Sequence, residues 1–258
     1  MLLKTILNMI LYPNAKINIG LKIESKRSDG YHNISSVFYP LKGSYDILEI
    51  TKSPVFLFSC SGIKIPNGEN LCEKAFKLID SKFSISPVHI HLHKRIPIGA
   101  GLGGGSSDAS FTLKGLNQLF NLKISNIELE KLSLKLGADC PFFIENTPKY
   151  VEGVGDKLAP LSLDLSEYNI KLINSDIHVS TMQAYSSVVI NSSKSLILDD
   201  ILNPISEWKD TIKNDFESNI FSAYPLLENI KNDLYKEGAI YASMSGTGSI
   251  VYGIFSKK

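Results

Sequence analysis

The sequence predicts an α+β fold in two domains, and three observations support this prediction. Apolar and polar residues alternate over residues 14–23, which is the period of a half-buried strand. From residue 106 to about residue 120 the apolar residues recur with helical spacing instead. A glycine-containing bend and a loop over residues 153–168 separate two halves that both mix such patterns, and we place the boundary between residues 158 and 159. A chain of 258 residues is long enough for each half to bury a core.

Composition narrows the class of protein. The chain is 43% hydrophobic and 21% charged, and its 27 Lys and Arg against 26 Asp and Glu leave a formal charge of +1. This balance indicates no basic field for nucleic acid and no polybasic membrane patch, so we expect small-molecule partners. We also expect a monomer or weak homodimer, although no sequence pattern carries that expectation. Cys60, Cys72 and Cys140 form no C-x-x-C pair, which argues against a disulfide scaffold and fits a reducing, cytoplasmic compartment.

The N-terminal segment leads into a strand with one polar face. Residues 1–11 are apolar but too short to span a bilayer, and no small-residue cleavage site follows them. In the strand at 14–23, Lys16 and Asn18 lie on the polar face. Ser28-Asp29-Gly30 then forms a turn.

Helices are predicted where helical spacing follows a capping signal. Asn70 with Glu73 forms a capping box that begins a helix over 70–81. Ser125 with Glu128 begins another helix, which we expect to end at Gly137. The other expected elements are strands at 37–41, 46–51, 88–92 and 170–173, helices from Thr181 through Val189, at 214–222 and at 225–236, and a hairpin of 239–243 and 249–255.

Three histidines near one strand raise a metal hypothesis. His89, His91 and His93 share one face of the strand that starts at residue 88. A row along a strand makes a poor tetrahedral cage, and no Cys or carboxylate lies nearby in the sequence. We therefore expect a solvated strand face and name no metal ligands.

The stretch from Pro97 to Ala109, Pro-Ile-Gly-Ala-Gly-Leu-Gly-Gly-Gly-Ser-Ser-Asp-Ala, carries the strongest functional signal. Its five glycines allow backbone N–H groups to converge on an anion at the start of the helix that follows. A flexible linker is the alternative interpretation. We favour a phosphate-binding loop because the stretch lies between a strand pattern and an amphipathic helix pattern.

Two common phosphate motifs do not fit this stretch. Gly99, Gly101 and Gly104 match the spacing of the dinucleotide fingerprint. However, residues 94–98 separate them from the strand, and no acidic residue ends a clear second strand about twenty residues further on. The Gly-Lys-Ser/Thr of a Walker loop is also absent.

Three motifs in the right order resemble those of the GHMP kinases, the family of galactokinase, homoserine kinase, mevalonate kinase and phosphomevalonate kinase. The second and most specific is the stretch 97–109; the first resembles residues 14–18 and the third resembles residues 245–249. The resemblance runs from about residue 12 to residue 255. It implies a two-domain GHMP kinase fold, with an ATP-binding N-terminal domain over 1–158, similar to domain 2 of ribosomal protein S5, and a ferredoxin-like C-terminal domain over 159–258.

Within this family, residues 16–18, 27–32, 137–141 and 152–155 resemble the members that phosphorylate 4-diphosphocytidyl-2-C-methyl-D-erythritol. The resemblance implies a kinase that transfers a phosphoryl group from ATP, as co-substrate with Mg²⁺, to the 2-hydroxyl of that compound. The products would be the 2-phosphate and ADP, in the non-mevalonate (methylerythritol phosphate) pathway of isoprenoid and terpenoid precursor synthesis.

The resemblance also implies which residues bind ATP. Asn70 and Lys94 are expected near the adenine, and a hydroxyl of Ser106 or Ser107 is expected at Mg²⁺ or at a phosphate oxygen. The residues expected around the triphosphate are Pro97, Ile98, Gly99, Ala100, Gly101, Leu102, Gly103, Gly104, Gly105, Ser106 and Ser107.

Lys16 and Asp139 are the candidate catalytic residues. Asp139 would act as the general base for the acceptor hydroxyl. Lys16 would keep that carboxylate ionised and offset the charge that develops on the phosphoryl group. The alternatives are a helix-capping aspartate and an exposed strand lysine.

Tyr31, His32 and Tyr185 resemble a cytosine-reading set, because aromatic rings stack on a flat base. Asn18 is expected to touch the substrate from the face that carries Lys16. Tyr185 fits a core position equally well.

Two rival functions stay open: another kinase of the family, whose mevalonate or homoserine acceptor has no base, and an inactive nucleotide-binding paralogue, which predicts loss of Lys16 or Asp139.

Overall fold

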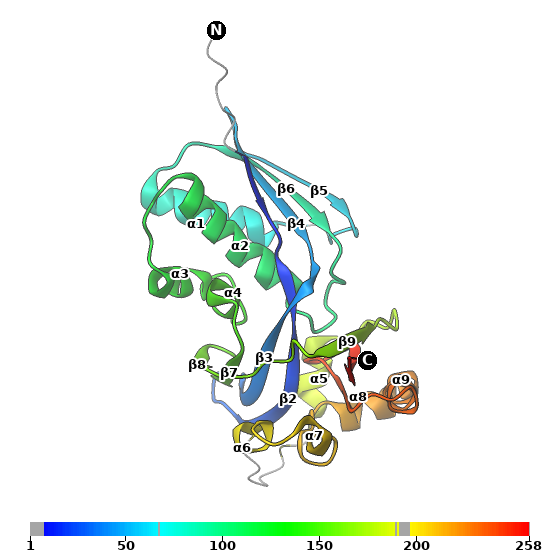
Figure 1. The fold of residues 1–258 in the computed structure, drawn as a ribbon. Helices are drawn as coiled ribbons and strands as arrows, with labels where there is room; N and C mark the ends of the chain where they lie inside the picture. The colour runs from blue at the N-terminus through cyan, green and yellow to red at the C-terminus, as the bar shows by residue number, and fades with distance from the viewer. Residues whose placement is uncertain (1–7, 67, 189, 191–196, 258) are drawn as a thin grey trace. The chain divides into compact units, whose positions relative to one another are not determined.

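The structure, a computed structural model, describes residues 8–66, 68–188, 190 and 197–257 (Figure 1). Packing divides the chain into two compact units, each assembled from separate stretches. The first unit comprises residues 1–15, 41–98 and 103–146, and the second comprises 16–40, 99–102 and 147–258. The proposed boundary between residues 158 and 159 is a single cut, whereas these units interleave along the chain.

The first unit is a four-stranded sheet with helices packed on it. The strand order is β1-β4-β6-β5, in which β4 pairs antiparallel with β1 and β6, and β5 pairs parallel with β6. The strands are β1 (Asn8–Leu11), β4 (Ile47–Lys52), β5 (Leu57–Gly62) and β6 (Val88–Lys94), and the helices are α1 (Leu71–Phe83), α2 (Gly104–Leu119), α3 (Asn126–Ser133) and α4 (Phe142–Glu145).

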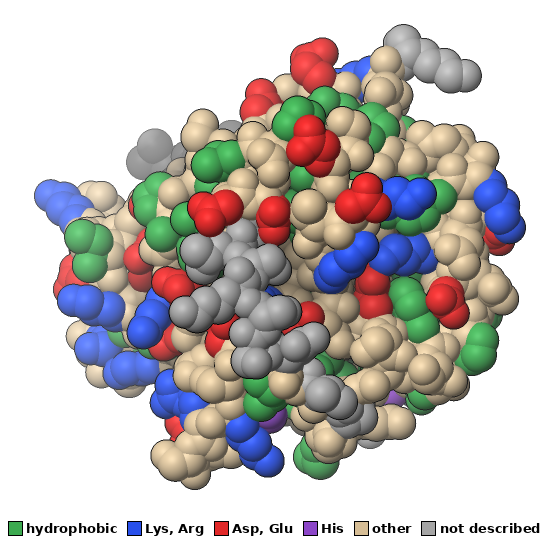
Figure 2. Space-filling model, turned by 90° about the horizontal axis from the view of Figure 1, so that it is seen from below, with side chains coloured by type: hydrophobic (Ala, Val, Ile, Leu, Met, Phe, Trp, Pro, Cys, Tyr) green, Lys and Arg blue, Asp and Glu red, His purple; other side chains and the backbone are tan. Residues whose placement is uncertain are grey.

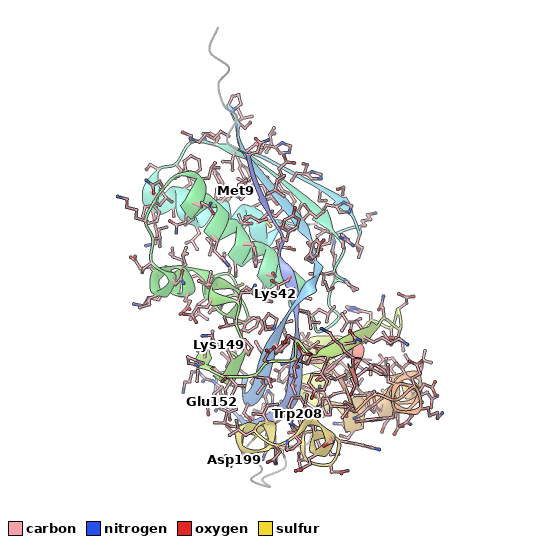
Figure 3. The ribbon with its side chains drawn as sticks, viewed as in Figure 1. Met9, Lys42, Lys149, Glu152, Asp199 and Trp208 are labelled. Carbon is pink, nitrogen blue, oxygen red and sulfur yellow. The ribbon has the colours of Figure 1, made fainter. Side chains whose placement is uncertain are left out.

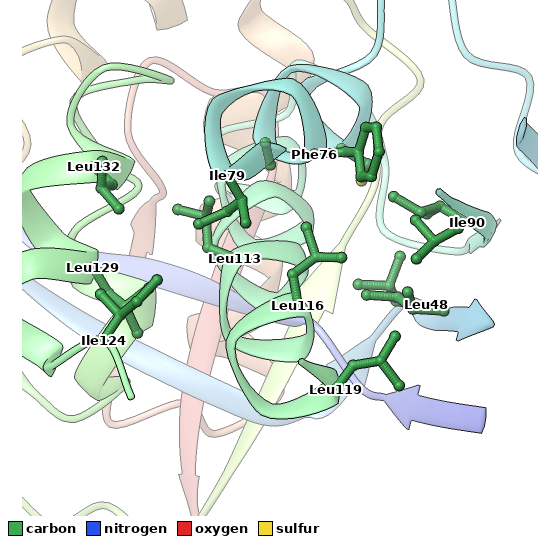
Figure 4. Packing of buried hydrophobic residues seen from close by; sticks show 14 of the residues in the cluster. Leu48, Phe76, Ile79, Ile90, Leu113, Leu116, Leu119, Ile124, Leu129 and Leu132 are labelled. Carbon is green, nitrogen blue, oxygen red and sulfur yellow. The ribbon is translucent and has the colours of Figure 1, made fainter. Parts of the chain in front are cut away.

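One hydrophobic core joins this sheet to its helices (Figure 4). Leu48 and Ile90 contribute from the strands, Ile79 from α1, and Leu113 and Leu116 from α2, all of them fully buried. Burying a side chain of this size stabilises a fold by about 1.5–3 kcal/mol relative to leaving it exposed. This packing holds α2, and with it the end of the glycine loop, against the sheet.

The second unit contains two further sheets. The first sheet has the order β2-β3-β7-β8, and the second has the order β10-β11-β9. The elements are β2 (Asn14–Lys26), β3 (His32–Tyr45), β7 (Lys149–Gly153), β8 (Lys157–Pro160), β9 (Tyr168–Ile173), α5 (Thr181–Ser187), α6 (Ile197–Ile201), α7 (Ile205–Thr211), α8 (Glu217–Ala223), α9 (Pro225–Lys236), β10 (Tyr241–Met244) and β11 (Val251–Ser256).

A second core fills this unit. Leu21 from β2 and Ile34 from β3 pack in one cluster with Phe216, Leu234 and Val251. N-terminal strands therefore share a core with C-terminal helices and strands, although up to about 230 residues separate them in the sequence.

A buried pair of aromatic side chains packs elsewhere in the second unit. Trp208 of α7, labelled in Figure 3, is 1% exposed and packs edge-on against Tyr241 with 5.7 Å between ring centroids. Its indole N–H donates to the carbonyl of Asn203 at 3.1 Å, so the buried polar atom is satisfied.

Most predicted helices and strands are confirmed, and some boundaries are wrong. The helix at 225–236 and the capping box of Asn70 with Glu73 are as predicted. The helix expected to end at Gly137 ends at Ser133, because the next turn tightens: the Leu136 N–H donates to Ser133 O, three residues back, at 2.8 Å. The predicted end of another helix, Val189, lies outside the described residues.

The surface carries mixed charges. On the face shown in Figure 2, acidic and basic side chains are interspersed. Among the helices of the described ranges, none combines the length and the apolar character that crossing a membrane requires.

Candidate active site

The glycine loop runs from the end of β6 to the first turn of α2. Gly103 is the N-cap of α2 with φ +68°, and it has no side chain to cap the first N–H groups of the helix. Gly101 has φ +80°, and a Cβ there would lie 1.9 Å from the carbonyl oxygen of Ser245. Glycine is therefore required at residue 101 both by conformation and by space.

Ser106 and Ser107 lie in the first turn of α2, and the hydroxyl of one of them lacks a partner in the described part of the chain. The Ser107 side chain is fully buried, yet its hydroxyl has no hydrogen-bond partner among the described residues. An unsatisfied buried hydroxyl is costly unless a ligand pairs with it. Together with the uncapped N–H groups of the helix start, this hydroxyl makes an environment suited to a phosphate group.

Asp139 is tied to the same helix through its neighbours. The hydroxyl of Ser110 on α2 donates to the carbonyl of Cys140 at 2.7 Å. Asp139 itself lies half-buried in the turn that precedes α4. The first unit thus holds the predicted general base in a segment anchored to the helix of the glycine loop.

Lys16 lies on β2 in the second unit. Its side chain is 3% exposed, and its ammonium donates to Asn18 Oδ1 at 2.5 Å and lies 4.4 Å from the centroid of the Phe38 ring. Its backbone N–H donates to the carbonyl of Leu102 at 2.9 Å, which joins β2 to the glycine loop. The alternative of an exposed strand lysine is therefore wrong.

The C-terminal motif packs on both the loop and β2. The hydroxyl of Ser245 donates to the carbonyl of Gly101 at 2.8 Å and accepts from the Asn18 N–H at 3.2 Å. The Ile250 N–H donates to the carbonyl of Ala100 at 3.3 Å. Within the second unit, segments from three distant parts of the sequence therefore meet.

The structure brings two of the three predicted base-reading residues together. His32 stacks on Tyr185, with ring centroids 5.1 Å apart and planes 30° apart, and Tyr185 packs edge-on against the buried Phe216. Tyr31 is 65% exposed. Burial, helped by the charge of Lys26, lowers the pKa of His32, so that its imidazole is neutral at pH 7.

Asn70 and Lys94 are both engaged in protein contacts in the first unit. Asn70 Oδ1 accepts from the Cys72 N–H at 2.8 Å, which caps α1. The Lys94 ammonium pairs with Asp46 at 2.5 Å and with Asp108 at 2.7 Å. A role of either residue beside the adenine stays a prediction.

Sequence reasoning missed this buried ion-pair triad of Asp46, Lys94 and Asp108. Burial alone lowers the pKa of the Lys94 ammonium, but the charges of Asp108 and Asp46 outweigh it and raise that pKa. Burial raises the pKa of Asp108 to about 7, against the opposing effect of Lys94. The only signal in the sequence was the position of Asp108 directly after the serines of the loop.

The histidine row makes hydrogen bonds to serines. His91 contacts the Ser59 hydroxyl through Nδ1 at 2.8 Å and the Ser61 hydroxyl through Nε2 at 3.0 Å, and His89 and His93 contact the same two hydroxyls at 2.7 and 2.9 Å. Over the described ranges, no group of three or more His, Cys, Asp or Glu side chains is arranged to hold a metal ion.

Comparisons with known proteins identify the family. The model "GHMP kinases N terminal domain" matches residues 70–146, and "GHMP kinases C terminal" matches residues 200–258. A 4-diphosphocytidyl-2-C-methyl-D-erythritol kinase of Cytophaga hutchinsonii is 51% identical over 97% of this chain and 93% of its own length. The chain belongs to the GHMP kinase family.

Other members of the GHMP kinase family agree in sequence and fold. The kinase of the same name from Bacteroides fragilis (strain YCH46) is 48% identical over 96% of this chain and 92% of its own length. A crystal structure of 4-(cytidine 5'-diphospho)-2C-methyl-D-erythritol kinase superposes with a TM-score of 0.79 at 31% identity, over 95% of this chain and 90% of that one. The Methanococcus jannaschii mevalonate kinase, 14% identical with a TM-score of 0.68, covers 96% and 91% and shares the fold.

Membership confirms two predictions made from the sequence. The two-domain GHMP kinase fold with mixed helices and sheets is correct, and ATP is the co-substrate of this GHMP kinase. The roles predicted for individual residues are not tested by these comparisons and stay predictions.

Proposed function

We propose that this GHMP kinase transfers the γ-phosphoryl group of ATP to the 2-hydroxyl of 4-diphosphocytidyl-2-C-methyl-D-erythritol. The products are the 2-phosphate and ADP, within the non-mevalonate pathway to isoprenoid precursors. The observation that carries the proposal is the 51% identity, over nearly the whole of both chains, to a kinase named for that substrate.

ATP is held by the glycine loop and the start of α2. N–H groups of the stretch from Gly99 to Ser106 bind the phosphates, and the positive end of the helix dipole reinforces them; the Ser107 N–H already donates to the Gly103 carbonyl at 2.9 Å. The missing side-chain cap at Gly103 and the unpartnered Ser107 hydroxyl support this role.

The same serines fit a Mg²⁺ ion. Mg²⁺ prefers oxygen ligands and is usually bound through one or two protein oxygens together with the phosphates of its nucleotide. A hydroxyl of Ser106 or Ser107 would supply such an oxygen. When bound, the ion offsets the negative charge of the phosphates.

Phosphoryl transfer depends on positioning and charge more than on covalent participation. Asp139 accepts the proton of the acceptor hydroxyl as the oxygen attacks phosphorus. Lys16 stabilises the charge that builds up on the transferred group. Its burial and its fixed contact with Asn18 support this role, because an ammonium that is already oriented needs no reorganisation.

The stacked pair of His32 and Tyr185 supports recognition of the cytosine ring, together with Tyr31. A neutral imidazole has one donor and one acceptor nitrogen for the base. Asn18, whose side chain accepts from Lys16, is the other residue of β2 that we expect to touch the substrate. Mevalonate and homoserine contain no nucleobase, so a kinase for either acceptor would not need these aromatic side chains.

An ADP-release assay with three acceptors tests the proposal. We expect turnover with the cytidine substrate and little or none with mevalonate or homoserine. Turnover with only the latter two acceptors would replace this assignment by another kinase of the family. ATP binding without turnover of any acceptor would indicate an inactive paralogue, although Lys16 and Asp139 are both present.

We further infer that the enzyme works in the cytoplasm on small molecules, as a monomer or weak homodimer and without nucleic acid or membrane partners. The balanced charge supports the absence of nucleic acid and membrane partners, and the three scattered cysteines support the cytoplasm.

A further inference from the structure

Asn18 is held at four atoms, and all of its partners belong to the second unit. Its N–H donates to Ser245 Oγ at 3.2 Å, and its carbonyl accepts from the hydroxyl of Tyr252 at 2.8 Å. Its side-chain Oδ1 accepts from Lys16 at 2.5 Å, and its Nδ2 donates to Ser36 at 2.9 Å. The backbone of Asn18 is therefore fixed, and its side chain joins Lys16 to Ser36.

The hydroxyl of Ser36 determines which way the Asn18 amide faces. Ser36 Oγ is 2.6 Å from the carbonyl oxygen of Gly20, which can only accept, so the single hydroxyl proton must point there. Ser36 can then only accept a hydrogen bond from Asn18. The amide must present its NH₂ group to Ser36, and consequently its oxygen to Lys16.

The opposite orientation of this amide would harm Lys16. It would place an NH₂ group, with its partial positive charge, against the ammonium and leave that contact without an acceptor. Lys16, Asn18 and Ser36 are all at least 97% buried, so water cannot readily compensate.

We propose that Ser36 is a positioning residue of the phosphoryl-transfer site, acting through the orientation of the Asn18 amide on the Lys16 ammonium. This inference rests on the proposed role of Lys16. Ser36 itself is fully buried, so it acts without touching substrate or ATP. Its removal therefore affects the chemical step rather than the binding of ATP.

Ser35 provides a matched control on the same strand. It is also buried, at 3% exposure, but neighbouring side chains of a strand point to opposite faces. Its hydroxyl donates to Glu24 Oε1 at 2.6 Å, on the face of β3 opposite to that of Ser36. Ser35→Ala thus removes a buried hydroxyl from β3 without changing the Asn18 amide.

The experiment compares Ser36→Ala, Ser35→Ala, Asn18→Ala and the double variant Ser36→Ala/Asn18→Ala in steady-state kinetics. We expect Ser36→Ala to lower kcat about tenfold to a hundredfold, the range expected for a displaced catalytic group, with KM for ATP within about twofold. Ser35→Ala should keep kcat within about twofold. Because Ser36 acts through Asn18, adding Ser36→Ala to Asn18→Ala should lower kcat no further.

Each result has a definite meaning. Wild-type protein that does not turn over the cytidine substrate would overturn the proposed function and this inference with it. Lys16→Met at the wild-type rate would overturn the role of Lys16, and therefore this inference, while the proposed function would stand. An active wild type with an unchanged kcat in Ser36→Ala would overturn the inference alone. So would a full additional loss in the double variant, or an equal loss in Ser35→Ala, since both indicate a structural effect unrelated to the amide.

Discussion

At the scale of single residues, a substitution of Asp139 should affect the chemical step without affecting the binding of ATP. Asp139→Asn removes the group that accepts the proton of the acceptor, whereas ATP binding depends on the glycine loop. We expect kcat to fall by about 10²–10⁴, the usual contribution of a general base, with the Kd for ATP little changed. Steady-state kinetics and ATP titration calorimetry measure the two quantities. Asp233→Asn on the exposed face of α9 is the control, and normal turnover in Asp139→Asn would remove Asp139 as the base.

His32 gives a residue-scale prediction about pH. Because its pKa is lowered in the folded protein, the unfolded chain binds a proton first as the pH falls through about 6.5. Proton binding then stabilises the unfolded state more than the folded state, which lowers the free energy of unfolding. The stability that neutral His32 contributes is therefore present at pH 7.5 and lost toward pH 5.5. Thermal unfolding of wild type and His32→Gln should show a gap in Tm that narrows on acidification. A gap that is constant across this range contradicts the prediction.

Residue types near the reaction could be predicted from the sequence, but their partners could not. Lys16, Asp139 and the glycines stand in short motifs, and local patterns carry that information. Asn18 is hydrogen-bonded to Ser36, 18 residues away in the sequence, and to Ser245, 227 residues away. Contacts at such sequence separations cannot be predicted from local periodicity. Only the paired strands and the shared core bring these groups together.

At the scale of elements, the glycine loop and its contact with the C-terminal motif form one functional part. Gly101→Ala would force a Cβ into the carbonyl of Ser245 and strain a φ of +80°. We expect at least a tenfold weaker Kd for ATP and a loss of stability of about 1 kcal/mol or more. Gly43→Ala on β3, where a Cβ meets no atom within 4 Å, is the matched control. Calorimetry measures the Kd for ATP and denaturant titration measures the stability of both variants. Equal values for Gly101→Ala and Gly43→Ala would contradict the prediction.

The buried triad fixes the start of α2 relative to β6. Asp46 Oδ1 accepts from the N–H groups of Arg95 and Ile96 at 2.5 and 2.8 Å, and its other oxygen pairs with Lys94. Lys94→Met would leave two buried carboxylates without their cation, at a cost of about 3–5 kcal/mol.

A surface pair in the same unit supplies the comparison. Lys77 pairs with Glu69 at the surface, where its side chain is 65% exposed and solvent screens the pair, so Lys77→Met should hardly change the stability. Urea unfolding measures both variants. Similar losses would show that the triad contributes no more than a surface pair does.

Elements with strong periodicity or caps were predicted, and the others were not. The alternation of apolar and polar residues predicts β6, and the helical spacing of apolar residues predicts α9. β5, Leu57–Gly62, has no such alternation, because it is an edge strand with mostly exposed or half-buried residues. β7 and β8 lie within a stretch whose glycines indicate a bend, and the sheet that they extend is visible only in three dimensions.

At the scale of the whole molecule, the two compact units do not follow the order of the chain. The second unit needs residues 16–40, because β2 and β3 continue the sheet of β7 and β8 and supply Leu21, Ile23 and Ile34 to its core. A boundary read along the sequence cuts through this arrangement. The GHMP kinase fold is therefore assembled from non-local contacts, which local patterns describe poorly.

This arrangement predicts the behaviour of the C-terminal half by itself. A fragment of residues 159–258 retains β9 to β11 and α5 to α9 but lacks β2 and β3, so buried side chains such as Phe216 and Val251 lose apolar partners. Losing the three buried aliphatic side chains of Leu21, Ile23 and Ile34, each contributing about 1.5–3 kcal/mol, removes a large part of the stability of about 5–15 kcal/mol that a typical domain has. We expect the fragment to show no cooperative thermal unfolding by circular dichroism and poor dispersion of amide signals by NMR, while the full chain shows both features. A cooperative transition in the isolated fragment would mean that the C-terminal half is an independent domain and that β2 and β3 only dock onto it.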